Sequence, residues 1–302
     1  MLPFSRVAII GLGLIGSSIA RAVKAQMPGV ALTGFDADAE VRETAHAIGL
    51  CDDIADHAGA AVTDADLVIL CVPVGAMAAA AAEIADDLPA DAVLSDVGSC
   101  KESVVAALRE MLPNATIVPA HPVAGTERSG PEAGFAALFR NRWCILTPGE
   151  GTDALAIERV SAFWKALGAE IEIMDPAHHD RVLAITSHLP HLIAYTIVGT
   201  ASDLEEVTSS DVIKYSAGGF RDFTRIAASD PTMWRDVFLS NREAVLDMLQ
   251  RFSEDLSALQ RAIRWGKSEE LFDLFTRTRA VRRSIVEQGQ DDAREDFGRS
   301  HD

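Results

Sequence analysis

The sequence contains few cysteines and few basic residues, and each shortage excludes a class of protein. Its four cysteines include no Cys-x-x-Cys pair, so the sequence predicts neither a disulfide framework nor a metal or redox site of that type. Lysine and arginine number 27 against 45 aspartates and glutamates, for a formal net charge of −18. A surface of this charge repels nucleic acid and anionic membranes. It also repels an anionic substrate unless a local group of basic side chains binds that substrate.

Long apolar runs are also missing. Glycine or charged residues interrupt every stretch that could cross a membrane, and the N-terminus lacks the successive basic, apolar and small-residue segments of a secretion signal. We therefore expect a cytoplasmic protein with neither a membrane nor a nucleic-acid partner. With 302 residues, of which 48% are apolar, the chain is long enough for two globular domains.

The order of short apolar runs and helical patterns predicts the fold. Up to residue 174 the two alternate, which is typical of a mostly parallel sheet with helices on both faces. The expected strands are Val7–Ile10, Ala31–Phe35, Leu67–Val72, Val93–Val97, Ile117–Pro119, Cys144–Thr147 and Glu170–Met174. The expected helices between them are Ile15–Gln26, Ala39–Ile48, Gly75–Asp86, Lys101–Met111 and Ala154–Leu167.

Beyond Asp175 the sequence shows helical periodicity and no convincing strand. It therefore predicts an α/β domain over residues 1–174 and an all-helical domain over residues 175–288. The remaining residues, 289–302, are polar and have no apolar period, so we expect a disordered tail there.

One long helix is expected after Pro231. Its apolar residues recur at spacings of 4, 3, 4, 3 and 4, at Val245, Leu249, Phe252, Leu256, Leu259 and Ile263. Such a seam is either the inner face of a core or a dimer interface, and the pattern by itself leaves both interpretations open.

A glycine loop follows the first expected strand and opens the first expected helix. Its sequence, Gly11-Leu12-Gly13-Leu14-Ile15-Gly16, has the spacing of the dinucleotide-binding fingerprint. In such a loop Gly11 permits a tight turn, Gly13 lets the backbone approach a pyrophosphate, and Gly16 lets helix and strand pack closely. The phosphates bind to the backbone amides at the helix N-terminus, here those of Leu14, Ile15 and Gly16. We therefore expect the α/β domain to be a Rossmann-like dinucleotide-binding domain.

Asp36 ends the second expected strand, 20 residues after Gly16. An acidic side chain at this place accepts hydrogen bonds from the adenosine ribose, and its charge repels the 2′-phosphate of NADP. The loop and Asp36 together predict NAD as the cofactor. Val72 and Pro73 end another strand at the edge where ligands of an open α/β sheet bind, so they are further candidate cofactor contacts.

Two polar segments follow later strands of the α/β domain. One contains Ser99, and the other begins with His121 before Pro122, which favours an extended backbone for the histidine. A histidine placed there can take the proton of an alcohol that gives up a hydride, and Ser99 can orient it. A histidine after a strand is more often a structural cap, so this position alone leaves both interpretations open.

Histidines also occur in the helical domain. Pro190 lies between His188 and His191 in a helical pattern, so we expect a kink that turns the two histidines inward. Two histidines without a third ligand are a poor zinc signal, and no metal site is expected. For His178 and His179 we expect a solvated loop.

Arg221 and Arg225 follow a glycine-rich turn in the helical domain. The planar guanidinium forms paired hydrogen bonds with a carboxylate, which makes Arg225 a candidate for binding one. The alternative is a surface ion pair, for which Asp222 is the obvious partner.

These motifs occur together in the order found in one known family. The chain resembles the prephenate/arogenate (cyclohexadienyl) dehydrogenases of tyrosine biosynthesis. The matching segments run through most of the chain, and they are Gly11–Gly16, Gly98-Ser99 with Lys101, His121–Glu127, His188–His191, Gly219–Ala227 and Asp230–Phe238. The combination is far more specific than any single motif.

The resemblance implies an NAD-dependent oxidative decarboxylation, in which hydride leaves C4 of a cyclohexadienol, the ring carboxylate departs as CO2 and the ring becomes aromatic. It implies that His121 hydrogen-bonds the ring hydroxyl and assists its deprotonation, and that Ser99 positions both groups. It further implies Arg225 as the carboxylate anchor and His191 as a second substrate contact. The other implied site residues are Thr126, Glu127, Arg221, Trp234 and His188. Because the helical domain is the dimer interface of the family, a homodimer is implied as well.

Two other functions stay open at the level of sequence. A 3-hydroxyacid-type NAD dehydrogenase shares the glycine loop and a helical second domain, but the segment His121–Glu127 argues against it. An NAD-sensing binding protein would keep the loop but has no reason to keep Ser99, His121, His191 and Arg225 together. Prephenate and arogenate, which differ by a keto or an ammonium group on the side chain, are both candidate substrates.

Overall fold

The computed structural model describes residues 2–126, 128–208 and 218–287. The chain forms two compact units. The first comprises Met1–His191 and Ala228–Val245, and the second comprises Leu192–Ala227 and Leu246–Asp302.

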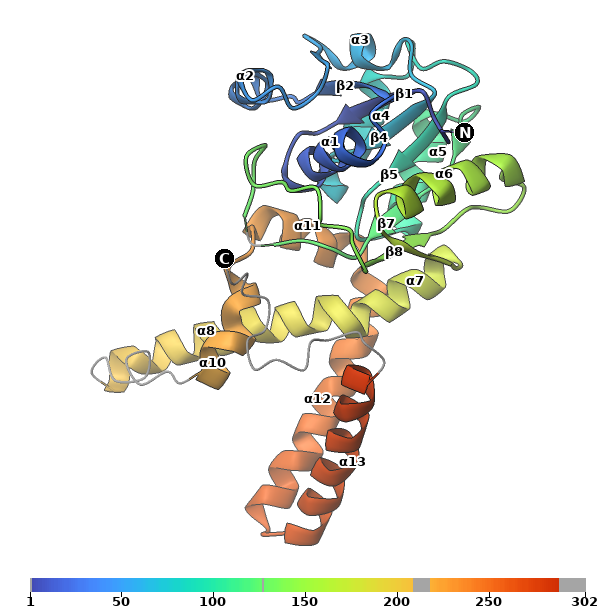
Figure 1. Cartoon of the computed structure of the whole chain (residues 1–302). Coiled ribbons are helices and arrows are strands. Elements are labelled where there is room, and N and C mark those ends of the chain that lie inside the picture. The colour runs from blue at the N-terminus through green and yellow to red at the C-terminus, as the bar shows by residue number, and fades with distance from the viewer. Residues whose placement is uncertain (1, 127, 209–217, 288–302) are drawn as a thin grey trace. The chain divides into compact units, whose positions relative to one another are not determined.

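The first unit is built on a six-stranded parallel sheet (Figure 1). In spatial order its strands are β3 (Asp53–Ile54), β2 (Ala31–Phe35), β1 (Arg6–Ile10), β4 (Leu67–Leu70), β5 (Val93–Asp96) and β6 (Thr116–Ile117). The helices are α1 (Leu14–Gln26), α2 (Ala39–Ala47), α3 (Ala58–Val62), the short η1 (Val74–Ala76), α4 (Met77–Glu83), α5 (Glu102–Met111) and α6 (Ala154–Ala166). This order places β1 and β4 side by side at the centre, and their carboxyl ends lie at the same edge.

Helices cover both faces of this sheet. Strand β1 shows the arrangement, because Val7 and Ile9 pack into one core with residues of α1 and α6. Ala8 and Ile10 pack into a second core with residues of α3, α4 and α5. Since both faces are buried, the strand is continuously apolar, as a doubly covered parallel sheet requires. The predicted α/β fold is confirmed here.

A second, smaller sheet is the main departure from the sequence-based prediction. It contains β7 (Ala120–Pro122), β8 (Trp143–Leu146) and β9 (Glu170–Ile173), with β7 antiparallel and β9 parallel to β8. The prediction of one sheet with a strand over Ile117–Pro119 is therefore wrong. Pro119 has no N–H to donate to a ladder, so the chain leaves the first sheet there, and the Pro119 carbonyl instead accepts from the Thr147 amide at 3.0 Å.

The remaining described elements are all helical, as predicted. They are α7 (Pro176–Leu183), the π-helical turn η2 (Ala184–His188), α8 (Leu189–Thr208), α10 (Gly218–Thr224), the short η3 (Arg225–Ala228), α11 (Pro231–Ser240), α12 (Arg242–Arg264) and α13 (Ser268–Glu287). The expected single helix after Pro231 is two helices separated at Asn241. The seam residues lie on α12. The predicted boundary at residue 174 falls between β9 and α7 and stays a prediction, and the tail expected over 289–302 lies outside the described residues.

The proline inside the predicted helix changes its form in a specific way. Pro190 has no N–H for the carbonyl four residues earlier, and the five-residue π turn η2 comes immediately before α8. Such widened turns are frequent at functional sites. The turn carries His188, and the first turn of α8 carries His191.

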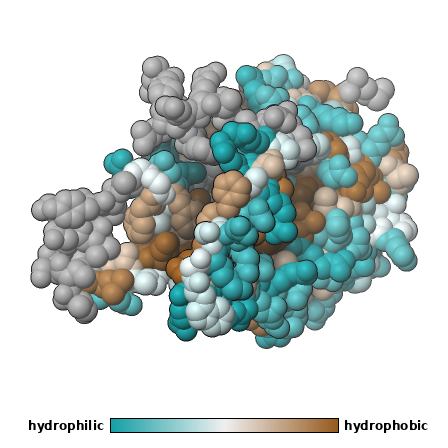
Figure 2. Space-filling model, turned by 90° about the horizontal axis from the view of Figure 1, so that it is seen from below, coloured by the Kyte–Doolittle hydropathy of each residue, from teal (hydrophilic) through white to brown (hydrophobic). Residues whose placement is uncertain are grey.

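Among the residues that the structure describes, one helical stretch is long and apolar enough to cross a membrane, by length and composition only. It is Pro176–Leu204, with a mean hydropathy of 1.4 in its most apolar window, of which 28% is buried. The expectation that every such stretch is interrupted is therefore wrong. Figure 2, which views the molecule from below, shows hydrophobic residues exposed between polar ones on this face. Exposed apolar side chains of the second unit include Ile197, Val198, Leu204, Phe223, Leu246, Leu256, Ile263, Trp265, Phe272, Phe275 and Val281.

Candidate active site

The glycine loop lies between β1 and α1, at the carboxyl end of the central strand. Gly11 has a φ of +100°, a conformation that favours glycine. A Cβ on Gly16 would lie 2.0 Å from the Gly11 carbonyl oxygen, so helix and strand are too close for any side chain there. A Cβ on Gly13 would meet nothing within 4 Å, and no side chain caps α1. The space above Gly13 and the uncapped first-turn amides suit a pyrophosphate group.

Asp36 follows the end of β2 beside this loop. One carboxylate oxygen accepts a hydrogen bond from the Leu12 amide at 2.7 Å, and the other accepts from the Asp38 amide at 3.0 Å. The carboxylate is half-buried and fixed next to the loop, where a nucleotide ribose would lie. Val72 also lies there, because its Cγ1 is 3.1 Å from the position of a Gly11 Cβ. Pro73 precedes η1 at the same edge.

Substitutions of Gly13 and Gly16 should distinguish a loss of cofactor binding from a loss of fold stability. We expect Gly13→Ala to weaken NAD binding by about tenfold or more while the melting temperature changes little, because its methyl group occupies only the space that the cofactor needs. We expect Gly16→Ala to lower the melting temperature strongly, because its methyl group collides with backbone. Calorimetry with NAD and thermal unfolding measure the two effects. Equal losses of stability in both variants would contradict this assignment.

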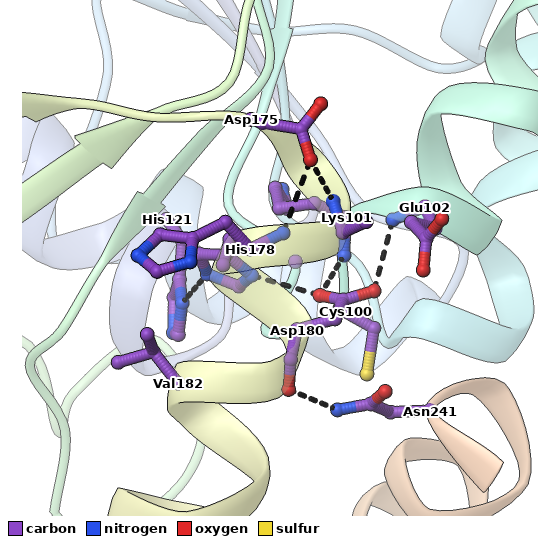
Figure 3. A network of polar contacts seen from close by, with 12 residues as sticks. Cys100, Lys101, Glu102, His121, Asp175, His178, Asp180, Val182 and Asn241 are labelled. Atoms are coloured by element: carbon purple, nitrogen blue, oxygen red, sulfur yellow. Dashed lines mark hydrogen bonds and ion pairs between the residues drawn. The ribbon is translucent and has the colours of Figure 1, made fainter. Parts of the chain in front are cut away.

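Three buried side chains, those of His121, His179 and Asp180, form a connected line (Figure 3). His121 lies within β7, where it is 8% exposed, and its Nδ1 is 2.8 Å from Nε2 of His179 on α7. Nδ1 of His179 is 2.8 Å from Oδ1 of Asp180. Asp180 also accepts hydrogen bonds from the amides of Lys101 and Glu102, at 2.8 and 3.0 Å.

These contacts determine which nitrogen of each ring holds the proton. Asp180 is surrounded by donors and accepts from Nδ1–H of His179, so Nε2 of that ring is an acceptor. His121 therefore donates its Nδ1–H to His179. The Nε2 of His121 is left without a proton and can accept one, as a general base requires.

The electrostatics of the line favour uncharged rings. Burial lowers the pKa of His121 well below its usual range, and His179, Lys101 and His188 lower it further. Burial also lowers the pKa of His179, against the opposing effect of Asp180. Both histidines are thus neutral at physiological pH, the state that the hydrogen-bond directions require.

Asn241, at the break between α11 and α12, connects this line to His188. Its side-chain amide donates to the Asp180 carbonyl at 2.8 Å and contacts Nδ1 of His188 at 3.1 Å. Burial lowers the pKa of His188 to about 4, partly offset by the Asp180 carboxylate and the backbone of Ser99. Ser99 itself is half-buried, and its contact with His188 is made by its backbone.

His191 lies one turn beyond His188 and packs on α11. Its ring stacks on that of Trp234, with centroids 3.7 Å apart and an angle of 23° between the planes. His188 contacts the same indole edge-on at 6.0 Å. The structure therefore brings together five of the residues that the sequence suggested: Ser99, His121, His188, His191 and Trp234.

Two expectations about these residues are wrong. His121 is not in a loop after a strand, because it pairs within β7 with Ile145 of β8. His178 and His179 do not form a solvated loop, because both lie on α7, and His179 is fully buried. His179 and Asp180 are therefore the site residues that sequence reasoning missed.

The other expected site residues are placed as follows. Thr126 is exposed, and its hydroxyl accepts from the Arg128 amide at 3.2 Å. Glu127 lies outside the described residues. Arg221 on α10 and Arg225 at the start of η3 are exposed and belong to the second compact unit. Within the described chain, no group of three or more His, Cys, Asp or Glu residues is arranged to hold a metal ion.

Two family models match this chain. The model of the prephenate dehydrogenase nucleotide-binding domain matches residues 19–173, and the model of the prephenate dehydrogenase dimerization domain matches residues 175–277. The chain belongs to the prephenate dehydrogenase family. This membership confirms the resemblance found in the sequence, together with the order of an α/β domain before a helical one.

Relatives of known name cover nearly the whole chain. A cyclohexadienyl dehydrogenase of Zymomonas mobilis is 46% identical over 285 residues, which are 94% of this chain and 97% of that protein. A prephenate dehydrogenase of Bacillus subtilis is 36% identical over 271 residues, which are 89% and 73% of the two chains. The crystal structure of A. aeolicus prephenate dehydrogenase in complex with hydroxyphenyl propionate and NAD+ matches with a TM-score of 0.87 at 34% identity. That match covers 93% of this chain and 98% of the other.

Proposed function

We propose that this protein is an NAD-dependent dehydrogenase that oxidatively decarboxylates prephenate, arogenate or both. The products are 4-hydroxyphenylpyruvate and tyrosine, respectively. The observation that supports this most is the line His121–His179–Asp180, which leaves Nε2 of His121 as a buried acceptor in a member of the prephenate dehydrogenase family. The glycine loop and Asp36 suit NAD at the neighbouring strand edge.

The geometry explains what the protein contributes to this reaction. Bound NAD supplies the acceptor for the hydride that leaves C4 of the ring. His121 accepts a hydrogen bond from the 4-hydroxyl through Nε2 and withdraws its proton as the hydride leaves, while His179 holds the imidazole in the correct tautomer. Loss of CO2 makes the ring aromatic and the step strongly downhill, so the protein chiefly orients the substrate and receives a proton.

The remaining substrate contacts are proposed from the family motifs. Arg225 binds a carboxylate, and Arg221 adds positive charge that this acidic chain needs for an anionic substrate. Ser99 positions the hydroxyl, and the stack of His191 on Trp234 lines the ring site. Thr126, Glu127 and His188 complete the set.

The test is turnover by the purified chain. Prephenate and NAD should give NADH and CO2 in equal amounts, and kcat/KM for prephenate and arogenate, each with NAD and NADP, defines the preference. NAD should exceed NADP because Asp36 repels a 2′-phosphate. Oxidation of a 3-hydroxyacid, with no NADH formed from prephenate or arogenate, would overturn the proposal.

His179 allows a test of the tautomer argument. We expect His179→Phe to lower kcat by about 10- to 1000-fold, less than loss of the base itself, because His121 can then place its proton on either nitrogen. His179→Gln, whose amide oxygen can still accept from His121, should recover part of that loss. If the two variants had equal kcat and both folded normally, His179 would not control the tautomer.

The exposed apolar residues of the second unit support a homodimer, which we place in the cytoplasm. Phe272 on α13 is 71% exposed and Trp265 is 64% exposed, and groups of exposed apolar side chains mark interaction surfaces. Phe272→Asp should therefore shift the sedimentation of the protein from dimer toward monomer. Thr276→Asp adds the same charge to the same helix without removing an apolar side chain and should shift it less. A wild-type protein that sediments as a monomer would refute this arrangement.

A further inference from the structure

The first compact unit contains a buried ion pair that the proposed reaction does not use. The side chains of Lys101 and Asp96 have no exposed surface, and the Lys101 ammonium bonds directly to Oδ2 of Asp96. The same oxygen accepts from the Gly98 amide at 2.7 Å. Oδ1 of Asp96 is buried and has no hydrogen-bond partner among the described residues.

Fold stability does not account for this pair. Removing two charges from water costs more than most buried pairs recover, and apolar side chains of similar volume usually stabilise a core as well or better. Here one carboxylate oxygen also lacks a partner, which adds to the cost. A lysine that is completely buried therefore calls for a role other than packing.

Lys101 makes contacts at both ends of the line His121–His179–Asp180. Its ammonium donates to the carbonyl of Ala120 at 2.7 Å, and Ala120 is the residue before His121 in β7. Its backbone amide donates to Oδ1 of Asp180, the oxygen that also contacts His179 (Figure 3). One residue thus holds both ends of the line.

We propose that Lys101 is a positioning residue, whose ammonium fixes the backbone next to His121 and whose amide fixes Asp180, so that the line is held for His121 to act as the base. Asp96 holds that cation in place. The proposal rests on the proposed function, because it assigns the purpose of the ion pair to the base of that reaction.

The charged and titratable groups around His121 determine how its pKa should change when Lys101 is removed. His179 contacts its ring, and Lys101 and His188 act on it through space. Asp180 lies beyond His179, and Asp96, which is paired with the lysine, is not among the groups that shift the pKa of His121. Of these groups, Lys101 lowers the pKa of His121 through its charge. Its removal should therefore raise the pKa of His121, and the acid limb of kcat/KM should move to higher pH.

The experiment removes both charges together, so that neither is left buried alone. In D96N/K101M we expect the acid limb of kcat/KM to move up by about one pH unit, which lowers kcat/KM about tenfold on the acid side. NMR titration of the His121 imidazole in the NAD-free protein should show the same upward shift. K165M, which removes an exposed lysine on α6, serves as the control and should leave both unchanged.

The NMR titration separates this proposal from the proposed function, because it needs no turnover. If the wild-type protein does not oxidise prephenate or arogenate, the function fails, and the titration still decides the role of Lys101. An unchanged His121 titration in a folded D96N/K101M protein would overturn the proposal. The apolar pair D96L/K101M is the second variant, for use if the first does not fold, and the same outcomes apply to it.

Discussion

Replacing His121 with asparagine is expected to lower kcat by about two to four orders of magnitude while NAD binds almost as tightly as in the wild type. The asparagine amide can still donate to Nε2 of His179, so the neighbouring contacts are kept, but no group remains to accept the substrate proton. Steady-state kinetics and calorimetric titration with NAD measure the two quantities. His178→Asn changes an exposed histidine only one position from His179 and should leave kcat unchanged.

The pH dependence of the wild-type protein follows from the same residue. As the proposed base, His121 can accept a proton only when it is uncharged, and its surroundings lower its pKa well below the usual range. Activity should therefore persist as the pH falls through 6.5, where an unperturbed histidine would become half protonated. Activity that falls with an apparent pKa near 6.5 would show that His121 is not the base, as would an unchanged kcat in His121→Asn.

Replacing Arg225 with glutamine is expected to lower kcat/KM by about 30-fold to several thousand-fold, the equivalent of about 2–5 kcal/mol for a desolvated pair that loses one charge. The substrate is an anion and the chain carries a net charge of −18, so little else attracts it. Most of the loss should appear in KM.

Arg279→Gln provides the matched control for Arg225→Gln. It removes the same charge from an exposed position on α13, so it tests whether net charge alone explains the effect. Equal kcat/KM in the two variants would remove Arg225 from the site.

Much of the fold was predictable because local chemistry determines it. The glycine loop can be recognised from spacing alone, since Gly11 needs a positive φ and Gly16 has no room for a side chain. The position of His121 was less predictable. Pro119 ends one ladder and the next residues join another sheet, and which strand they join depends on contacts with β8 more than 20 residues later.

The missed pair His179–Asp180 shows where sequence reasoning failed. Two adjacent histidines in a polar segment look solvated, yet a helix start was recognisable from Asp175 and Pro176, a capping residue followed by proline in the first turn. From that start, His179 and Leu183 fall on one face four residues apart, and both are buried. The helical period was therefore the available signal, but the partner on β7 could come only from the tertiary structure.

The π turn at Ala184–His188 has a consequence for how this helix can vary. One additional residue in a turn rotates everything after it by roughly 100° about the helix axis. The side chains of α8 therefore face a different direction from the one that a regular continuation of α7 would give them. Asp180 lies on α7, before the turn, and His191 lies on α8, after it. A deletion of one residue within the turn would keep each of these side chains and yet swing the later ones to a different side. The number of residues between α7 and α8 therefore matters to the candidate site as much as the identity of its side chains.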